Sequence, residues 1–420
     1  MLKAEQRVSS GDRPRLLILG TGFGARHVLQ RIDTRRFDVR IISPRNHFLF
    51  TPLLPSTTVG TVEFRTIIEP IRSVRRGCEY LQGLVKAIDV TAGRVTCGDI
   101  HGQGEWDEPY DRLIVAVGSV TNDFGLPGVD EHALALKELS DARRIRQRLI
   151  ENLERASLPC TPTAEVSRLM HFVVVGGGPT GVRFAAELID LLTDELSRLY
   201  RQLREHIKVT VVDSAAQLLS SYDAHLREHV QEVFRHRGVQ FEPHCEVARV
   251  TASGVELKDG RHLAAGMVLW CVGFAPNPLI AALDWQKDRA GRLLVDDRLQ
   301  VVDHPHIYAI GDCAAGPGSA LPQLAQVAAQ QGDYLARALN RRGSKTTPPF
   351  RWHNRGFSSY IGQSEAVVDV PDQHKRSAGH WAYQSWRVSI WSDLLSWRSR
   401  IWIPLDRLRA AVFGRDLSQF

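Results

Sequence analysis

The sequence of 420 residues predicts an α/β protein with two Rossmann-like dinucleotide-binding domains. A short apolar strand at residues 15–19 enters a glycine-rich turn and then a helix, and the same order of elements recurs at 172–188. In each copy, a later apolar run also ends in glycine, at 113–118 and at 267–273. The chain therefore repeats one plan, and we expect each copy to bind a dinucleotide.

Composition limits the classes of function that fit. With 43% hydrophobic and 24% charged residues the chain is typical of a globular protein, and its length is enough for two or three domain cores. The net charge of +6 suits an anionic membrane surface or a nucleic acid; we expect the membrane surface and no nucleic acid. Six cysteines without a CxxC pair indicate a reducing compartment, no structural zinc and no dithiol of the disulfide-reductase type.

Targeting and membrane-spanning segments are not expected. The first 15 residues lack the apolar centre of a secretory signal. Two long uncharged runs, 263–283 and 313–332, contain glycine together with proline and do not read as spanning helices. We also see no cluster of metal-ligating residues and expect no metal.

The first copy carries a GxGxxA fingerprint after its apolar strand, with Gly20 for the turn and Gly22 for close approach of a pyrophosphate. Its second strand, 38–42, ends at Ser43, where this fold usually has an acid that binds ribose; a hydroxyl can still do so, and Arg45 is close by. Residues 48–56 are apolar and aperiodic, which predicts a buried irregular strap against a ligand or the core.

The second copy has a complete GxGxxG turn at Gly176, Gly178 and Gly181, whose free N–H groups at the helix start would hold phosphates. The next strand, 207–212, ends at Asp213. Its carboxylate would bind both ribose hydroxyls and repel a 2′-phosphate, so we expect NADH rather than NADPH. Arg183 is anomalous because a cation is disfavoured in the first turn of a helix.

Other segments are predicted with less specific signals. We expect helices at 137–156, at 185–205 and at 321–341, the last opened by Pro322. The proline-bearing stretch 158–165 reads as a linker. The predicted domains are 1–160 with 285–345 for the first dinucleotide, 166–284 for the second, and 346–420 as a C-terminal segment.

Several motifs resemble one known family along nearly the whole chain. They are LGTGFG at 19–24, SPRNHFLFTPLLPSTTVGTVEFR at 43–65, the glycine turn at 176–181, YAIGDC at 308–313, AQVAAQQG at 325–332 and FGRDLSQF at 413–420. The chain thereby resembles the type II NADH dehydrogenases, which are single-subunit flavoproteins that pass electrons from NADH to a membrane quinone without pumping protons. The long 43–65 string is closest to the mitochondrial-type branch. The resemblance implies a glutathione-reductase-like arrangement of the two domains.

The resemblance also implies site residues. For FAD these are Gly20, Gly22, Phe23, Gly24, Ser43, Pro44, Arg45, Thr51, Pro52, Leu53, Ala116, Gly118 and Asp312, and for NADH they are Gly176, Gly178, Thr180, Gly181, Asp213 and Gly273. It assigns the quinone end to Gln326 and Gln330. These two lie four apart on a predicted helix, so their carboxamides share a face and could donate to quinone oxygens. The plainer alternatives are that both glutamines are solvated and that Asp312 is an ordinary helix cap.

Two positions depart from the family pattern. The family has a glutamate two residues after the third glycine, where this chain has Arg183, so we count Arg183 among the residues that affect the reaction. Arg355 and Phe357 also stand where smaller or apolar residues are common in the family.

The tail concentrates tryptophan and arginine. Over 386–402, one helical stripe carries Trp386, Ile390, Leu394, Trp397 and Ile401, and the other face carries serines, arginines and an aspartate. Tryptophan and arginine together favour a monotopic helix in the lipid headgroup region, on the cytoplasmic face of the inner membrane. A core helix or a homodimer contact is the alternative.

We therefore expect an FAD-dependent NADH:quinone oxidoreductase that reduces a quinone at a site lined by Gln326, Gln330 and the strap residues 51–54. Two other readings remain open. One is an NAD(P)H-dependent flavoprotein reductase with a different acceptor. The other is a flavin-binding redox sensor in which Arg183 has impaired turnover.

Overall fold

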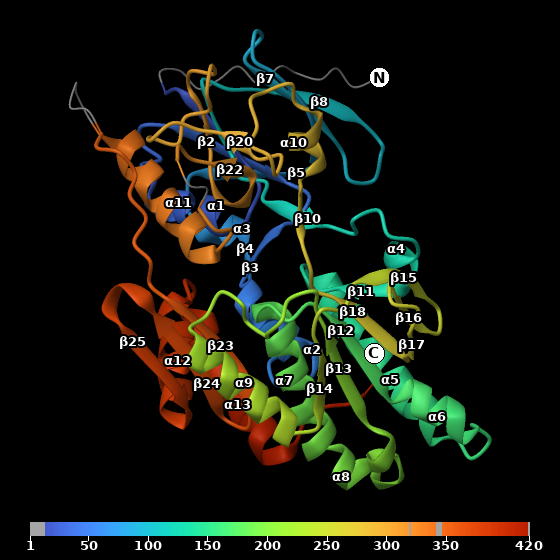
Figure 1. Ribbon diagram of the computed structural model, residues 1–420. Coiled ribbons are helices and arrows are strands. Elements are labelled where there is room, and N and C mark those ends of the chain that lie inside the picture. The colour runs from blue at the N-terminus through green and yellow to red at the C-terminus, as the bar shows by residue number, and fades with distance from the viewer. Residues whose placement is uncertain (1–12, 319–320, 342–346, 419–420) are drawn as a thin grey trace. The chain divides into compact units, whose positions relative to one another are not determined.

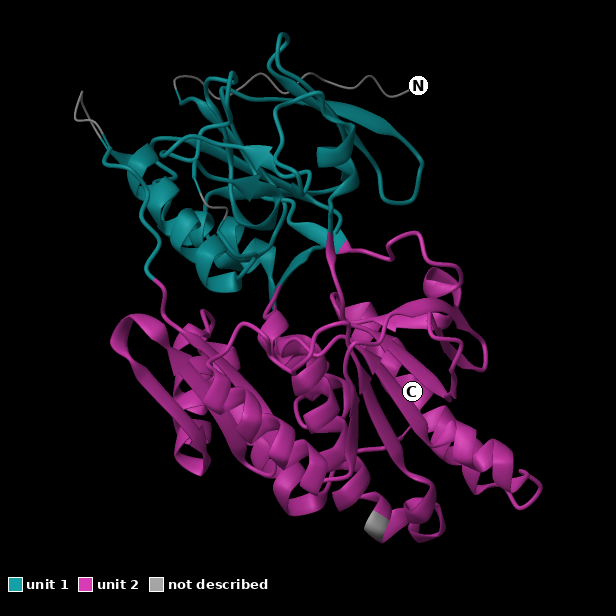
Figure 2. Cartoon of the chain, in the orientation of Figure 1, with its two compact units in different colours: residues 1–48, 69–120, 275–353 teal, residues 49–68, 121–274, 354–420 magenta. Residues whose placement is uncertain are grey.

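The computed structural model describes residues 13–318, 321–341 and 347–418. The chain forms two compact units, each assembled from three segments (Figures 1 and 2): unit 1 contains residues 1–48, 69–120 and 275–353, and unit 2 contains residues 49–68, 121–274 and 354–420. The ends of the predicted first domain and of the FGRDLSQF motif lie outside the described residues.

Unit 1 is built on a five-stranded sheet in the order β21-β9-β1-β2-β5, with every pair parallel. Its strands are β1 (Arg15–Leu19), β2 (Asp38–Ser43), β5 (Cys78–Gln82), β9 (Arg112–Val115) and β21 (Ile307–Ala309). After Arg15 the central strand is apolar and buried to its end, because parallel sheets are covered on both faces. Helix α1 (Phe23–Arg31) packs against α11 (Ala325–Asn340) beside it in Figure 1. A small antiparallel sheet completes the unit with β6 (Leu84–Asp89), β7 (Arg94–Gly98) and β8 (Glu105–Pro109).

Unit 2 repeats this architecture with the order β11-β18-β12-β13-β14, again all parallel. Its strands are β11 (Ala133–Ala135), β12 (His171–Val175), β13 (Lys208–Val212), β14 (Val239–Glu242) and β18 (Met267–Trp270). The flanking helices are α5 (Leu139–Ser157), α7 (Pro179–Asp194) and α9 (Ala224–His236). The small antiparallel sheet here consists of β15 (Val247–Thr251), β16 (Gly254–Leu257) and β17 (His262–Ala264).

The C-terminal module, residues 354–418, is part of unit 2. It contains an antiparallel sheet of β23 (Phe357–Gly362), β24 (Glu365–Val370) and β25 (Lys375–Gly379), followed by α12 (His380–Asp393) and α13 (Trp397–Phe413). Strand β23 lies along α7, and α12 lies along β24 (Figure 1). The glycine-turn helix of unit 2 is therefore covered by the end of the chain.

Shorter elements complete the description. They are β3 (His47–Leu49), α2 (Leu54–Thr58), β4 (Ile68–Pro70), α3 (Ile71–Val74), β10 (Ser119–Thr121), α4 (Val129–His132), α6 (Thr163–Leu169), α8 (Leu196–Leu199), β19 (Phe274–Pro276), α10 (Pro278–Ala282), β20 (Leu293–Leu294) and β22 (Ala314–Ala315).

The predicted α/β class and the strands of both copies are confirmed, whereas the bounds of two helices and of one linker were wrong. The helix expected at 185–205 instead spans Pro179–Asp194, and Tyr200 (φ −132°, ψ 51°) separates α8 from a 3₁₀ helix at Arg201–His206. The helix expected from residue 321 begins at Ala325, because the backbone of Leu324 is extended. The predicted linker 158–165 already contains the start of α6, with Pro162 at its N-cap.

Two further predictions need correction. The strap at 48–56 is buried except at Thr51, which is exposed, and Pro52, which is partly buried, and it folds into a 3₁₀ turn (Thr51–Leu53) and the short helix α2. The tail is not one amphipathic helix over 386–402, because the helix breaks after Asp393 and restarts at Trp397. Trp386, Ile390 and Leu394 are buried, whereas Trp397 and Ile401 are exposed, so the predicted stripe is divided between a packed and an open surface.

Candidate active site

The fingerprint of unit 1 requires glycine at its first position. Gly20 has φ +104°, and a Cβ there would lie 2.3 Å from the carbonyl oxygen of Ala116. This close approach brings the turn between the carboxyl ends of β1 and β9. Gly22 is the N-cap of α1, and a Cβ there would meet open space. The N–H groups at the start of α1 are therefore accessible to a phosphate.

At the end of β2, a hydroxyl pair stands where an acid is usual. The Oγ of Ser43 lies 3.3 Å from Oγ1 of Thr21 and accepts a hydrogen bond from the backbone N–H of Arg45 at 3.2 Å. Gln82 donates to the carbonyl of Pro44 at 2.8 Å, which fixes the turn that follows. The carboxyl edge of β2 thus presents two hydroxyl groups, and the guanidinium of Arg45 stands beside them, with its Nε donating to Oγ1 of Thr21 at 3.4 Å.

Asp312 follows β21 and is held by a residue that the sequence did not single out. Ser119 Oγ donates to Asp312 Oδ2 at 2.9 Å, and Gln323 donates to the Asp312 carbonyl at 3.1 Å. The adjacent N–H of Gly311 donates to Oε1 of buried Gln331 at 2.7 Å. Ser119 could have been found from its place directly after a strand–glycine turn. Gln331 could have been found from its neighbours in AQVAAQQG.

Helix α11 carries Gln326 and Gln330, both partly buried. The carboxamide of Gln330 exchanges two hydrogen bonds with the backbone of His353: its Nε2 donates to the carbonyl at 2.9 Å, and its Oε1 accepts from the N–H at 3.0 Å. Gln330 therefore anchors the chain where unit 1 ends. Its role at a quinone stays a prediction, as does that of Gln326.

The fingerprint of unit 2 is tighter than that of unit 1. Gly176 has φ +112°, and a Cβ on Gly181 would lie 1.9 Å from the carbonyl oxygen of Gly176. A Cβ on Gly178, the N-cap of α7, would meet open space. The first and third glycines thus bring strand and helix together, and the second leaves the helix start accessible.

Asp213 lies at the carboxyl end of β13, beside the glycine turn. Its Oδ2 accepts from the N–H of Gly177 at 2.5 Å and its Oδ1 from the N–H of Ala215 at 2.7 Å. These bonds orient the carboxylate at the edge where a dinucleotide ribose binds in this fold. Gly273, after β18, has φ +72° and lies against the ring of Phe124.

One face of α7 carries charged side chains at helical spacing. Glu187 and Asp190 are buried. Glu187 accepts hydrogen bonds from Ser56 (2.6 Å) and Thr61 (2.9 Å), and Asp190 accepts one from Tyr360 (2.6 Å) and pairs with Arg237. The predicted strap and the C-terminal module are therefore both bound to this helix. Neither acid was singled out from the sequence, although their spacing from Arg183, four and seven residues, places them on its face.

Arg183 is partly buried on the same face. Its Nη1 donates to the carbonyl of Pro52 at 2.6 Å and its Nη2 to the carbonyl of Ser358 at 3.1 Å. The guanidinium carbon also lies 5.7 Å from the ring centroid of Trp386. Burial lowers the pKa of Arg183, and neighbouring Tyr222 and Glu187 act in the opposite direction. Arg183 thus contacts the strap and the C-terminal module at once.

The predicted residues fall into two groups by unit. Unit 1 holds Gly20, Gly22, Phe23, Gly24, Ser43, Pro44, Arg45, Ala116, Gly118, Asp312, Gln326 and Gln330, and unit 2 holds Thr51, Pro52, Leu53, Gly176, Gly178, Thr180, Gly181, Arg183, Asp213 and Gly273.

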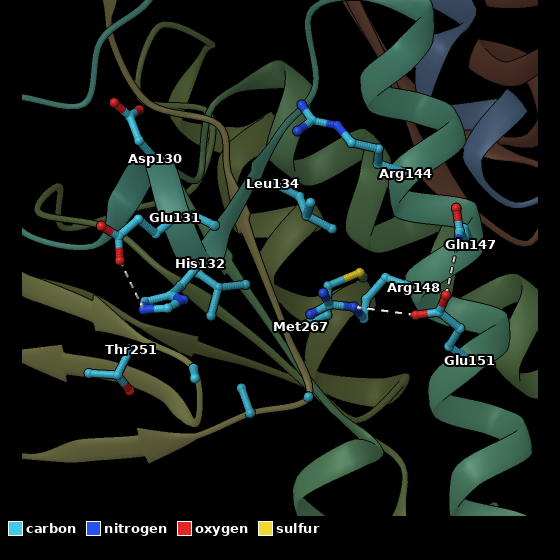
Figure 3. Close-up of a pocket in the computed structure, with 15 residues that line it drawn as sticks. Asp130, Glu131, His132, Leu134, Arg144, Gln147, Arg148, Glu151, Thr251 and Met267 are labelled. Carbon is cyan, nitrogen blue, oxygen red and sulfur yellow. Dashed lines mark hydrogen bonds and ion pairs between the residues drawn. The ribbon is translucent and has the colours of Figure 1, made fainter.

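A cavity of about 430 Å³ lies elsewhere in unit 2, between α5 and the edge of the sheet (Figure 3). Met267 and Ala133 line it, and each is the first residue of its strand. Arg148 and Glu151 pair within it. Because dinucleotides bind at the carboxyl ends of such strands, this cavity lies at the wrong edge of the sheet for NADH.

Comparison with known proteins gives matches over almost the whole chain. The family described as pyridine nucleotide-disulphide oxidoreductase matches residues 14–332, and the NDH2 C-terminal domain matches residues 355–416. A probable NADH dehydrogenase of Dictyostelium discoideum is 36% identical over 428 residues, covering 100% of this chain and 94% of that protein. The internal alternative NAD(P)H-ubiquinone oxidoreductase A1 of Solanum tuberosum mitochondria is 34% identical and covers 99% of this chain and 90% of that protein.

A solved structure gives the same result. NDH2 from Plasmodium falciparum in complex with NADH superposes with a TM-score of 0.92 at 26% identity, covering 97% of this chain and 100% of that one. Together with the two fingerprints and the module after residue 354, these matches identify the chain as a member of the pyridine nucleotide-disulphide oxidoreductase family and, within it, of the type II NADH dehydrogenases.

Proposed function

We propose that the chain oxidises NADH with FAD and passes the electrons to a membrane quinone. NADH gives up two electrons and one proton as a hydride, and the quinone becomes a quinol by taking two electrons and two protons, one of which comes from solvent. FAD, when bound, accepts the hydride and releases the electrons to the quinone. The observation that carries the proposal is the presence of two complete dinucleotide edges in one chain.

The residues of unit 1 fit FAD. Open space in front of Gly22, at the start of α1, suits a pyrophosphate. Ser43 offers a hydroxyl to a ribose, and Asp312, oriented by Ser119, offers a carboxylate to the hydroxyls of the ribityl chain. These contacts support binding of the flavin by residues from four separate parts of unit 1.

The residues of unit 2 fit NADH. The start of α7 is open at Gly178, and Asp213 presents a fixed carboxylate at the ribose position. A carboxylate there accepts hydrogen bonds from the 2′- and 3′-hydroxyls of NADH and repels the 2′-phosphate of NADPH. The internal enzyme of S. tuberosum is named for NAD(P)H, so the preference of this chain is a question for experiment.

Anaerobic titration of the purified holoenzyme tests the reaction. We expect NADH to bleach the flavin band and a short-chain quinone to restore it, with NADPH acting more weakly. If NADH does not bleach the flavin band, the proposal is contradicted. A flavin that is reduced by NADH but not reoxidised by quinones supports a reductase with a different acceptor, and tight FAD binding without any turnover supports a redox sensor.

We further propose that α12 and α13 attach the protein to a membrane surface. The large apolar side chains that they expose are Trp381, Val388, Trp391, Trp397, Ile401, Trp402, Leu405, Leu408, Val412 and Phe413. Trp381 is 82% exposed and Trp397 is 76% exposed, so neither side chain is packed against the rest of the protein. Exposed Arg387 and Arg398 stand beside them. Tryptophan with arginine is the composition of a lipid headgroup interface. In the described part of the chain, no helix combines the length and apolarity needed to span a bilayer.

Vesicle sedimentation tests the attachment. We expect the double substitution Trp397→Gln and Trp402→Gln to release the protein from vesicles that contain anionic lipid. The matched control is Leu158→Gln with Leu199→Gln, which removes exposed apolar side chains outside the C-terminal module. Deleting the tail from residue 383 is a poorer test because it removes buried Trp386 from the core. Equal binding by both double variants contradicts the proposal.

We propose, on the ground of charge, that the protein binds the cytoplasmic face of the inner membrane. A net charge of +6 and arginines beside the apolar patch suit the negative cytoplasmic leaflet of the inner membrane. A homodimer contact beside the patch is compatible with this orientation. Sedimentation velocity of the detergent-free protein, with and without the Trp397→Gln and Trp402→Gln changes, decides between a dimer and a monomer.

A further inference from the structure

We propose that Arg183 is a positioning residue for the acceptor half of the reaction: it fixes the strap turn Thr51–Leu53 against the C-terminal module. The proposal rests on the proposed function for its kinetic consequence. Its structural content, that one guanidinium joins the strap to the module, stands on contacts within unit 2 alone.

The first step is geometric. Arg183 projects from α7, and its two terminal nitrogens donate to backbone carbonyls that are 306 residues apart, those of Pro52 and Ser358. Pro52 lies in the middle of the 3₁₀ turn, and Ser358 is the second residue of β23. The planar fork of a guanidinium can bridge two acceptors at once, which a single ammonium group does less well.

The second step concerns charge. The nearest acid on the same face of α7, Glu187, already accepts hydrogen bonds from Ser56 and Thr61. Glu187 still favours the charged form of Arg183, but the direct contacts of the guanidinium are the carbonyls of Pro52 and Ser358 and the ring of Trp386. The same ring also lies 4.9 Å from the guanidinium carbon of Arg407. Trp386 also stacks on Tyr360 of β23, with ring centroids 5.4 Å apart. The guanidinium of Arg183 therefore lies where α7, β23 and α12 pack together.

The third step concerns the strap and the chain that follows it as far as Thr66, which are bound at successive points. Arg183 holds the first turn of the strap, and Glu187 holds Ser56 and Thr61. Further along, buried Asp406 of α13 accepts from the N–H of Glu63 at 3.0 Å and from Thr66 Oγ1 at 2.9 Å. Arg183 thus controls the end of the strap that contains the predicted ligand residues Thr51, Pro52 and Leu53.

A glutamate at position 183 would not serve in this setting. A carboxylate cannot donate to the carbonyls of Pro52 and Ser358, and it would stand one helical turn from Glu187 with the same sign of charge. We therefore expect Arg183→Glu to loosen the strap further and not to restore a family-like site.

The effect on the reaction should be selective. The predicted NADH contacts, Gly178, Gly181 and Asp213, lie at the glycine turn and the end of β13, and their geometry does not use the Arg183 side chain. Residues 51–54 of the strap were predicted to line the quinone site with Gln326 and Gln330. Loosening the strap should slow reoxidation of the flavin by quinone much more than reduction by NADH.

The experiment uses the full-chain holoenzyme and the variants Arg183→Lys, Arg183→Met and Arg183→Glu. Anaerobic stopped-flow absorbance at the flavin band measures reduction by NADH and reoxidation by a short-chain quinone separately. Loss of a charge-assisted hydrogen bond predicts reoxidation slower by about 10- to 100-fold in Arg183→Met, with reduction within about threefold of wild type. Arg183→Lys, which keeps the charge, should recover part of the rate, and Arg183→Glu should be slowest.

Hydrogen exchange followed by mass spectrometry supplies a readout that does not depend on turnover. We expect amides of 50–58 and 357–362 to exchange faster in Arg183→Met. The matched control is Arg237→Met, which removes another arginine that joins α7 to this module, by pairing with Asp190 of α7 and donating to the carbonyl of Ile361. It should lower the unfolding temperature and expose 357–362 while leaving the exchange of 50–53 and the ratio of the two half-reactions unchanged.

The outcomes separate this proposal from the proposed function. The positioning role is overturned if the strap amides of Arg183→Met exchange hydrogen at the wild-type rate. It is also overturned if flavin reduction and flavin reoxidation slow by the same factor. Full recovery by Arg183→Glu overturns it too. If wild-type flavin is not reduced by NADH, the proposed function fails, and the exchange data still decide whether Arg183 fixes the strap. If Arg183→Met does not fold, the comparison of Arg183→Lys with Arg237→Lys decides the same question.

Discussion

The two dinucleotide-binding units share four corresponding strands and differ in where the fifth comes from. In unit 1 the order is β21-β9-β1-β2-β5, and in unit 2 it is β11-β18-β12-β13-β14. The fingerprint strand is central in both. The fifth strand comes from late in the chain in unit 1 and from before the fingerprint in unit 2, so each unit is completed by chain outside its own repeat. The repeated sequence pattern therefore gives both units the same dinucleotide-binding edge, although the chain enters the fifth strand from a different place in each unit.

The element that covers the fingerprint helix also differs, and this decides the chemistry of that helix. Helix α1 is covered by α11, so closely that a Cβ on Gly332 would lie 2.3 Å from the carbonyl of Gly24. Helix α7 is covered by β23 and the strap. His27 and Arg183 occupy the same place in the two copies. His27 bonds to Asp333 of α11 at 3.0 Å, whereas Arg183 bonds to carbonyls. The covering element, not the fingerprint, explains the choice of residue.

The largest expected effect comes from exchanging the third small residue between the copies. Unit 1 has Ala25 at this position and unit 2 has Gly181. A methyl group on Gly181 would lie 1.9 Å from a backbone carbonyl, so strand and helix must separate. We expect Gly181→Ala to cost about 3 kcal/mol, and to weaken NADH binding by more than about 100-fold, while FAD stays bound. Titration of the flavin band with NADH measures this.

Ala25→Gly is the reciprocal control. It should keep both cofactors and lower stability by only about 0.5–1 kcal/mol, the usual cost of glycine inside a helix. If Gly181→Ala and Ala25→Gly lowered stability and cofactor binding equally, the two turns would not differ in the way that their packing indicates.

A smaller effect is expected at the strand ends, where unit 2 has Asp213 and unit 1 has Ser43. Asp213→Ser makes the second edge like the first and removes a carboxylate that accepts two backbone N–H groups. We expect KM for NADH to rise about 10-fold, which corresponds to about 1.4 kcal/mol, and KM for NADPH to rise less because a repulsive charge is lost. Steady-state rates with both nucleotides and one quinone measure the ratio. An unchanged ratio would remove Asp213 from nucleotide choice.

The sequence could predict the parts that depend on local pattern. Periodicity and glycine spacing are local properties of the sequence, and they were enough to predict the strand–glycine–helix turns and the parallel sheets that such turns belong to. The partners of Arg183 could not be predicted, since Pro52 and Ser358 contribute backbone carbonyls, which carry no residue signature. The same is true of Gln330, whose partner is the backbone of His353.

The tail shows a second limit. Its apolar spacing predicted one continuous face, but the break after Asp393 places Trp386 in the core at 1% exposure and leaves Trp397 open. Which tryptophan is buried depends on the stacking of Trp386 on Tyr360 and Tyr383. A composition argument cannot distinguish a buried from an exposed tryptophan, because both surfaces use the same residue type.

The smallest effect concerns the first residue of the fingerprint strand, which is Arg15 in unit 1 and His171 in unit 2. Arg15 pairs with Asp38 and Glu108. His171 is buried, and it bonds to the Ala264 carbonyl at 2.6 Å and to Thr210 at 2.9 Å. Burial lowers the pKa of His171 from 6.5 to about 4, so the folded protein keeps the ring neutral while the unfolded chain protonates it.

Unit 2 should therefore lose stability as the pH falls from about 7 towards 4, because the unfolded state binds more protons in this window. Between pH 7 and 5.5 the expected loss is about 1 kcal/mol, or roughly 2–4 °C in unfolding temperature. His47 of unit 1 also has its pKa lowered to about 4, so the wild-type curve contains both contributions. Thermal unfolding of wild type and His171→Gln across this range isolates the share of His171 as the difference in slope. If the unfolding temperatures of the two proteins changed in parallel with pH, protonation of His171 would cost no folding free energy. The difference between His171 and the permanently charged Arg15 would then not affect stability.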